Sequence, residues 1–157
     1  MLQVVILMVG KTRTGFVQEG MALYLRRLRP YLKLSLVTVR EEKPYAGLAA
    51  DLVREREGAR LLAKIPRPAR VVTLEVEGEL MTSEGLANWL TAHEQDSSAP
   101  VVFVLGGHLG LSPAVVAAVD HRLSLSRFTF THELSRLLLL EQLYRAMTIR
   151  RGHPYHL

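Results

Sequence analysis

The sequence contains no cysteine. This absence excludes disulfide bonds, thiolate metal sites and cysteine nucleophiles, and it agrees with a reducing compartment. Long hydrophobic runs are also missing: the first apolar run, Leu2 to Val9, is far shorter than the about 20 residues of a membrane helix. Because no basic segment precedes this run, we interpret it as a first strand rather than a signal peptide, and we expect a cytoplasmic protein.

The amino-acid composition fits one globular domain. The chain has 157 residues, of which 48% are hydrophobic, so it is long enough to bury a full core. Lys and Arg number 20 against 15 Asp and Glu, which gives a net charge of +5. This excess favours a polyanionic partner such as nucleic acid. We therefore expect a single domain over residues 1–157.

Strand-like and helix-like patterns alternate along the chain. Strands are predicted at Gln3 to Val9, Lys33 to Arg40, Val71 to Val76, Val101 to Leu105 and Leu123 to Leu125. Helices are predicted at Phe16 to Arg27, Leu48 to Ala63, Ser83 to Glu94, Pro113 to Val119 and Glu133 to Arg150. Hydroxyl residues that suit helix N-caps precede several of these helices: Thr82 or Ser83, and Ser112 before Pro113. This order is typical of an α/β domain with a mostly parallel sheet flanked by helices.

A glycine-rich loop follows the fourth predicted strand. In open parallel sheets, ligands bind outside the carboxyl ends of the strands, which here means the loops after Val76, Leu105 and Leu125. The pattern Gly106-Gly107-x-x-Gly110 lets backbone approach a ligand, but it differs from the dinucleotide fingerprint. The first strand ends in Val9-Gly10-Lys11-Thr12, which lacks the spacing of a P-loop, so a nicotinamide or nucleoside-triphosphate enzyme is disfavoured. A tight strand-to-helix turn explains the glycines equally well.

The segment Leu123 to Phe130 alternates small hydroxyl residues with apolar ones and then becomes aromatic. It offers backbone hydrogen-bonding groups and hydrophobic walls, which would suit a purine and a thioether. Taken singly, its apolar side chains are explained at least as well as ordinary core residues.

The last predicted helix and the chain end carry an unusual set of side chains. The helix is apolar over more than one stripe, which predicts a partner helix, most economically from an identical chain in a twofold dimer. Arg136 lies among its leucines, where a cation would face either the site or the partner. The end His153-Pro154-Tyr155-His156 has more chemical groups than a solvated terminus needs. A zinc site there is disfavoured because no third ligand stands nearby, and we predict no metal.

Several motifs together resemble the ribosomal RNA large subunit methyltransferase H family, and the resemblance covers the whole chain. The motifs are Gly106-Gly107-x-x-Gly110-Leu111-Ser112, Leu123-Ser-x-Ser-x-x-Thr129-Phe130-x-His132, Glu141-Gln-x-Tyr144-Arg145-Ala146 and His153-Pro154-Tyr155-His156. Supporting stretches include Glu55-x-Glu57-Gly58. The chain departs from the family's usual pattern at Leu109, often a polar or acidic position, and at Thr131, often a proline whose place a capping hydroxyl can take.

The resemblance implies an S-adenosylmethionine-dependent SPOUT-class enzyme: a homodimer with a C-terminal trefoil knot. It also implies methylation of N3 of pseudouridine 1915 in helix 69 of 23S ribosomal RNA, within the large subunit or the assembled 70S ribosome. Composition alone would not predict a knot, since knots are rare. The family's cofactor contacts fall on Leu74, Gly106, Leu125, Ser126, Arg127, Phe128, Thr129 and Phe130.

The implied chemistry needs alignment of the reactants and removal of one proton from a weakly acidic imide nitrogen. We expect His153 or His156 to assist this proton transfer, with Tyr155 at the base and Arg136 or Arg145 at a phosphate or the imidate oxygen. The tail is expected to act on the partner chain's site. Two alternatives stay open: a SPOUT methyltransferase acting on transfer RNA, and a noncatalytic RNA-binding domain.

Overall fold

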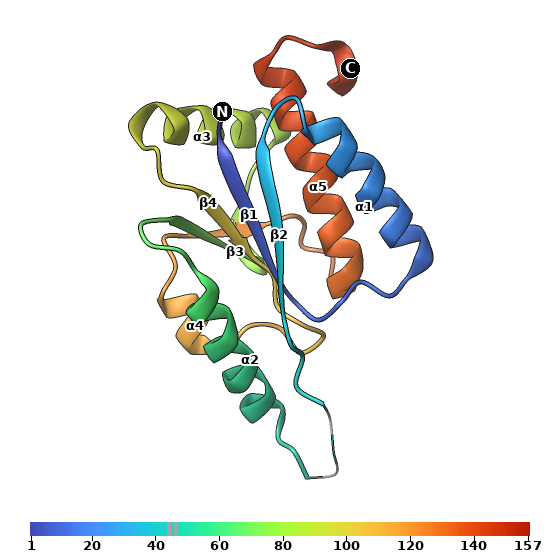
Figure 1. Cartoon of the computed structure of the whole chain (residues 1–157), viewed down its shortest axis with the longest axis vertical. Helices are drawn as coiled ribbons and strands as arrows, with labels where there is room; N and C mark the ends of the chain where they lie inside the picture. Colours follow the sequence, from blue (N-terminus) through green and yellow to red (C-terminus); the bar gives the residue numbers. More distant parts are fainter. Residues whose placement is uncertain (44, 46) are drawn as a thin grey trace.

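The computed structural model describes residues 1–43, 45 and 47–157. Five parallel strands form one sheet in the order β2-β1-β4-β3-β5, with helices on both faces (Figure 1). The elements are β1 (Gln3–Val9), α1 (Gly15–Leu28), β2 (Lys33–Val39), α2 (Ala50–Lys64), β3 (Arg70–Leu80), α3 (Ser83–Asp96), β4 (Val101–Val104), α4 (Pro113–Ala117), β5 (His121–Ser124), α5 (His132–Arg150) and the short 3₁₀ helix η1 (Pro154–His156). The predicted α/β class and the predicted order of elements are confirmed.

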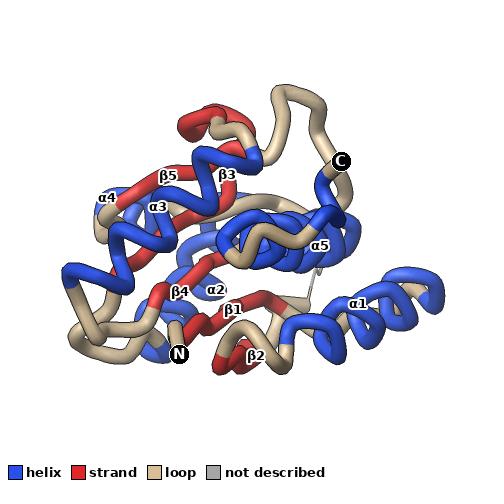
Figure 2. Tube along the Cα trace, turned by 90° about the horizontal axis from the view of Figure 1, so that it is seen from above, coloured by secondary structure: helices blue, strands red, loops and turns tan. Residues whose placement is uncertain are grey.

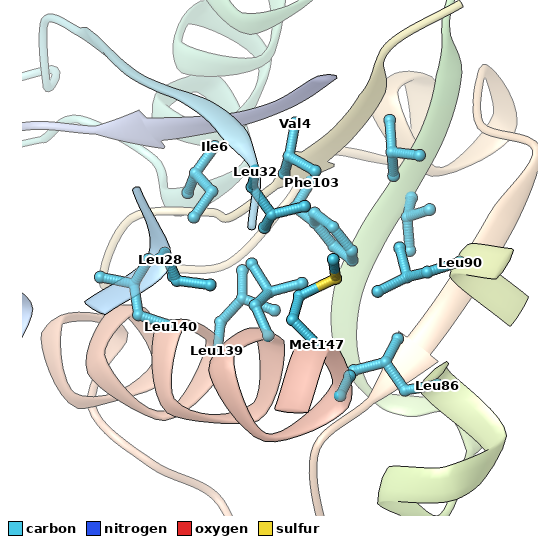
Figure 3. Close-up of a cluster of buried hydrophobic side chains, with 14 of the residues drawn as sticks. Val4, Ile6, Leu28, Leu32, Leu86, Leu90, Phe103, Leu139, Leu140 and Met147 are labelled. Atoms are coloured by element: carbon cyan, nitrogen blue, oxygen red, sulfur yellow. The ribbon is translucent and has the colours of Figure 1, made fainter. Parts of the chain in front are cut away.

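Alternating side chains of the central strands supply two separate cores. Val101 and Phe103 of β4 pack with α1, α3 and α5, whereas Val102 and Val104 pack with α2 and α4 on the opposite face. This division follows from the two-residue period of a strand. Figure 3 shows Phe103 above Met147 of α5 in the larger core. A continuous apolar run such as β4 is expected for a strand that is buried on both faces.

Helix α5 lies between α1 and α3 and contacts both. Every residue of α5 is buried or half-buried, including the half-buried Leu137 and Leu138. The wide apolar surface of this helix predicts a partner helix, most economically from a second chain. Helices α1 and α3 of the same chain cover much of that surface, so its width does not by itself require a second chain.

Side-chain caps fix where three helices begin. In each case a hydroxyl oxygen accepts a hydrogen bond from a backbone N–H in the first turn, as the sequence predicted. The three pairs are Thr82 with Gly85 N (2.9 Å), Ser112 with Val115 N (3.3 Å) and Thr131 with Leu134 N (3.1 Å).

Strand β3 continues four residues beyond its predicted end at Val76. Its pairing with β5 is interrupted: Leu74 and Glu79 both align with Leu123, so residues 75–78 bulge out of the ladder. A Cβ at Gly78 would lie 2.6 Å from the backbone carbon of Leu123, so only glycine allows this close approach. The sequence suggested a loop here because a glycine among alternating charges weakens the strand signal.

Within the described part of the chain, helices are too short or too polar to cross a bilayer. The trefoil knot stays a prediction of the resemblance.

The packing around α5 predicts a large stability effect at Leu139, which is fully buried. Leu139→Ala should lower the free energy of unfolding by about 2 to 5 kcal/mol, because it removes apolar contacts and leaves a cavity. Urea unfolding followed by circular dichroism measures this loss. Leu36→Ala is the matched control: Leu36 on the edge strand β2 is 37% exposed, and its truncation should change stability by less than about 1 kcal/mol. Equal losses in the two variants would contradict the core assignment.

Candidate functional site

A cavity of about 420 Å³ opens at the carboxyl edge of the sheet, the lower end in Figure 1. Three segments line it: the β3 bulge, the glycine loop after β4, and the loop between β5 and α5. These are the three loops predicted to form a ligand site. The lining residues are Leu74, Glu75, Val76, Glu77, Leu105, Gly106, Gly107, His108, Gly110, Leu111, Leu125, Ser126, Phe128, Thr129, Phe130, His132 and Ser135.

The glycine loop folds back on itself to form one wall. Gly110 N donates a hydrogen bond to Gly107 O at 3.0 Å, and Gly110 has a φ of +82°. A Cβ at Gly106 would lie 2.7 Å from the backbone carbon of Gly110, so a larger residue would force the two arms apart. The loop is therefore both a tight turn and a cavity wall, and the two interpretations of the glycines are compatible.

The facing wall is formed by the β5–α5 loop, which is tied to the β3 bulge. Ser124 Oγ lies 2.9 Å from Val76 O and 3.0 Å from Ser126 O. Arg127 also donates to Val76 O, and Ser126 Oγ accepts from Phe128 N at 3.0 Å. These bonds hold the loop in place and leave the Phe128 ring 80% exposed at the mouth of the cavity. Leu123 does belong to the core, whereas Leu125, Phe128 and Phe130 line the cavity.

Carboxylates and imidazoles stand among the lining residues. Burial opposes ionisation of Glu75, but hydrogen bonds from Arg122 and Thr73 hold its pKa below the ordinary value, so it is negatively charged. Burial, together with the charge of Arg136, lowers the pKa of His132 below 6.5. The His132 ring is therefore neutral at pH 7, and its centroid lies 6.5 Å from that of His108.

All of the predicted cofactor residues except Arg127 line the cavity: Leu74, Gly106, Leu125, Ser126, Phe128, Thr129 and Phe130. Arg127 is instead engaged with the backbone of Val76. Sequence reasoning missed Glu75, Glu77, His108 and Ser135. The available signal for Glu75, Glu77 and His108 was their position at or just after the predicted carboxyl end of a parallel strand.

Arg136 does not line the cavity, although it was expected to face the site or a partner chain. Its side chain is fully buried, with Nη2 donating to Val9 O at 2.5 Å and Nη1 to Thr12 Oγ1 at 2.8 Å. Burial lowers the pKa of this guanidinium from its ordinary value. The cation joins the end of β1 to the first turns of α5, next to His132.

The C-terminal tail lies at the opposite end of α5. This helix has 19 residues, so its ends are about 28 Å apart at 1.5 Å per residue. Figures 1 and 2 show the tail beside the last turn of α5, away from the cavity end of the helix. Within one chain, the structure does not bring His153, Tyr155 and His156 to the cavity.

Tyrosine contacts anchor this tail. Tyr155 Oη lies 3.2 Å from Tyr24 Oη and donates to Glu141 Oε1 at 3.3 Å, and the Arg145 guanidinium lies 4.9 Å from the Tyr155 ring centroid. Burial and the bond to Tyr24 raise the pKa of Tyr155, so its hydroxyl stays protonated. His153 Nδ1 lies 2.8 Å from Tyr31 Oη. The tail is thus ordered on its own chain.

The chain is similar over nearly its full length to known methyltransferases. A family model described as "Predicted SPOUT methyltransferase" matches residues 2–156. The putative ribosomal RNA large subunit methyltransferase H of Methanoregula boonei is 46% identical over 158 residues, covering 99% of each chain. The ribosomal RNA large subunit methyltransferase H of Halothermothrix orenii is 41% identical, also covering 99% of each chain.

Solved structures show the same fold at low sequence identity. A probable methyltransferase from Bordetella pertussis Tohama I has a TM-score of 0.57 at 14% identity, covering 93% of this chain and 96% of that chain. TrmJ from Z. mobilis has a TM-score of 0.54 at 16% identity, covering 94% of this chain and 71% of that chain. With the family model and the relatives above, these findings place the chain in the ribosomal RNA large subunit methyltransferase H family of SPOUT methyltransferases.

Proposed function

We propose that this protein uses S-adenosylmethionine to methylate N3 of pseudouridine 1915 in helix 69 of 23S ribosomal RNA, within the large subunit or the assembled ribosome. The observation that carries the proposal is the cavity of about 420 Å³ at the carboxyl edge, walled by the family's own motifs. The names of the relatives supply the substrate class.

The charge and shape of the cavity suit S-adenosylmethionine. Leu74, Leu125 and Phe130 offer apolar surface for an adenine ring. Gly106 and Gly110 have no side chains, so the ligand can contact their closely packed backbone directly. Glu77 favours a cationic ligand and disfavours a phosphate-bearing one, whereas the charge of Glu75 is paired with Arg122. The neutral His132 adds no positive charge that would oppose a cation. When bound, S-adenosylmethionine supplies an activated methyl group on a sulfonium.

The residues of the chain must then orient the target base and accept one proton from N3. Imidazole is the side chain best suited to this transfer near neutral pH, and the tail offers His153 and His156. Tyr155 and Arg145 hold the tail and stand beside these imidazoles, where they can contact the RNA base and its backbone. The cavity mouth adds Phe128, whose exposed ring is available for stacking.

A second copy of the chain would supply the tail. The tail folds back on the second half of α5, and none of its residues lines the cavity of its own chain, so we infer that each site in a homodimer takes His156 from the other chain. We also infer that Arg136 acts as a positioning residue. From its buried place it fixes the first turns of α5, which carry the cavity residues His132 and Ser135.

Ribosomal RNA as substrate implies a cytoplasmic protein.

Transfer of labelled methyl from S-adenosylmethionine to ribosomes from cells that lack the gene tests the proposal. Naked ribosomal RNA and transfer RNA serve as competing substrates, and mass spectrometry identifies the modified nucleoside. We expect a methylated pseudouridine in the large-subunit RNA. Labelling of transfer RNA alone would favour the first alternative function. Saturable RNA binding without cofactor binding would favour the noncatalytic alternative.

The cavity wall predicts that Gly106→Ala abolishes cofactor binding, because the new Cβ would lie 2.7 Å from the carbon of Gly110 and displace the loop. Isothermal titration with S-adenosylmethionine should show at least about a hundredfold loss of affinity, the size expected when several backbone contacts are misplaced together. Gly15→Ala is the control, since a Cβ there has no neighbour within 4 Å. Wild-type affinity in Gly106→Ala would remove the glycine loop from the binding site.

The trans arrangement predicts complementation between two inactive chains. A chain that lacks residues 153–157 and a Gly106→Ala chain should each be inactive alone, and a mixed dimer should regain one working site. Methyl transfer is measured after co-expression with two different affinity tags and purification through both. Absence of activity in a dimer whose chains fold and pair would exclude a tail that acts in trans.

A further inference from the structure

A buried carboxylate lies directly behind the glycine loop. Glu57, on α2, is 2% exposed, and its Oε2 accepts a hydrogen bond from Glu42 N at 3.0 Å. Its Oε1 is buried and has no hydrogen-bond partner among the residues that the structure describes. An unpaired buried carboxylate oxygen is costly, so it calls for a donor that this conformation does not provide.

The loop is the nearest source of such a donor. A Cβ built on Gly107 would lie 3.1 Å from Glu57 Oε1 and 3.6 Å from Oε2, so both carboxylate oxygens face the backbone of this cavity residue. No side chain separates them, because position 107 is glycine. The backbone N–H groups of Gly107 and the next residues are therefore the candidate donors for Oε1.

Helix α2 contacts the same loop at two further points. Arg54 Nη1 donates to Leu109 O at 3.3 Å, and Gly58 packs so closely on Ser112 that a Cβ would lie 2.4 Å from Ser112 Oγ. Ser112 is the N-cap of α4 and ends the loop. Three neighbouring residues of one helix thus contact the beginning, the tip and the end of the glycine loop.

We propose that Glu57 is a positioning residue for the cofactor: its Oε1 accepts a hydrogen bond from a backbone N–H of residues 107–109 when the loop closes on the ligand. Arg54 holds the tip of the loop by its carbonyl, and Glu57 holds its base by an N–H. The carboxylate also spans from the loop to Glu42, so it fixes the loop relative to the segment that follows β2. This inference rests on the proposed function for the identity of the ligand.

Glu57→Gln tests the proposal with almost no change in volume. An amide has one oxygen, so it can satisfy either Glu42 N or the loop, and not both. We expect the dissociation constant for S-adenosylmethionine to rise about tenfold or more, the effect of one lost hydrogen bond to a charged acceptor. The KM for ribosomes should stay within about twofold, since the RNA contacts are elsewhere. Glu55→Gln is the matched control, with the same charge change on an exposed position of the same helix.

A second measurement does not need the cofactor. Amide hydrogen exchange of residues 106–110 in the ligand-free protein should be faster in Glu57→Gln than in the wild type or Glu55→Gln, because the free loop exchanges between open and closed conformations and the closed one loses its hydrogen-bond acceptor. Arg54→Ala, at a half-buried position, should increase the same exchange by freeing Leu109 O. Unchanged loop exchange together with an S-adenosylmethionine affinity within twofold of wild type would overturn the proposal.

The outcomes separate this inference from the proposed function. If the wild type fails to bind S-adenosylmethionine while loop exchange still depends on Glu57, the ligand assignment falls and the positioning role stands. If the wild type binds and Glu57→Gln only lowers the melting temperature, without a change in affinity or loop exchange, Glu57 is a structural residue and the inference is wrong.

Discussion

Close approach of backbone to backbone at the carboxyl edge of the sheet is the constraint on which the site depends. At Gly78, β3 approaches β5 so closely that no side chain fits, and this contact accompanies the bulge that brings Glu75 and Glu77 to the cavity. At Gly106, the two arms of the glycine loop meet at a similarly short distance. Close main-chain packing therefore fixes the position of both cavity walls, and side chains such as Leu74, Leu125 and Phe130 line them. Such walls suit a ligand that is recognised by its shape and by hydrogen bonds to backbone groups of the protein.

The charges of the protein are divided between two regions. The chain as a whole carries +5, yet the β3 bulge places Glu75 and Glu77 at the cavity. Arg122 pairs with Glu75 at the bulge, and a second group of exposed cations lies near the C-terminal end of α1, at Arg26, Arg27 and Arg29, and at Arg151 beside the tail. The carboxylates that line the cavity favour a small cationic ligand, whereas the basic end favours a polyanion. The proposed cofactor and the proposed RNA can therefore use different charges.

The sequence predicted those features that depend on local patterns. Alternation of apolar runs and helical periods gave the parallel sheet, and hydroxyl residues such as Thr82 and Ser112 marked true helix starts. The position of the ligand loops followed from the general rule for parallel sheets.

Features that depend on long-range packing were not predictable in this way. The end of β3 was misplaced because its last residues are held by β5, which lies more than 40 positions further along the chain. Arg136 was expected to face the site or a partner chain, but its partners are the carbonyl of Val9 and the hydroxyl of Thr12, over 120 positions away. No window of sequence around residue 136 contains that information.

The same limit applies to Glu57, whose helical surroundings give no sign that its carboxylate faces a glycine in another loop.

Helix α5 sets the distance between the two halves of the proposed site. Its first turns carry His132 and Ser135 at the cavity, and its last turn leads into the tail. Packing between α1 and α3 holds this helix in place, and the tail folds back along it only as far as Glu141, short of the cavity residues. A twofold axis perpendicular to such a helix exchanges its two ends, so one interface would place each tail near the other chain's cavity and build two sites at once. The separation that prevents a site within one chain is thus the geometry that a symmetric pair requires.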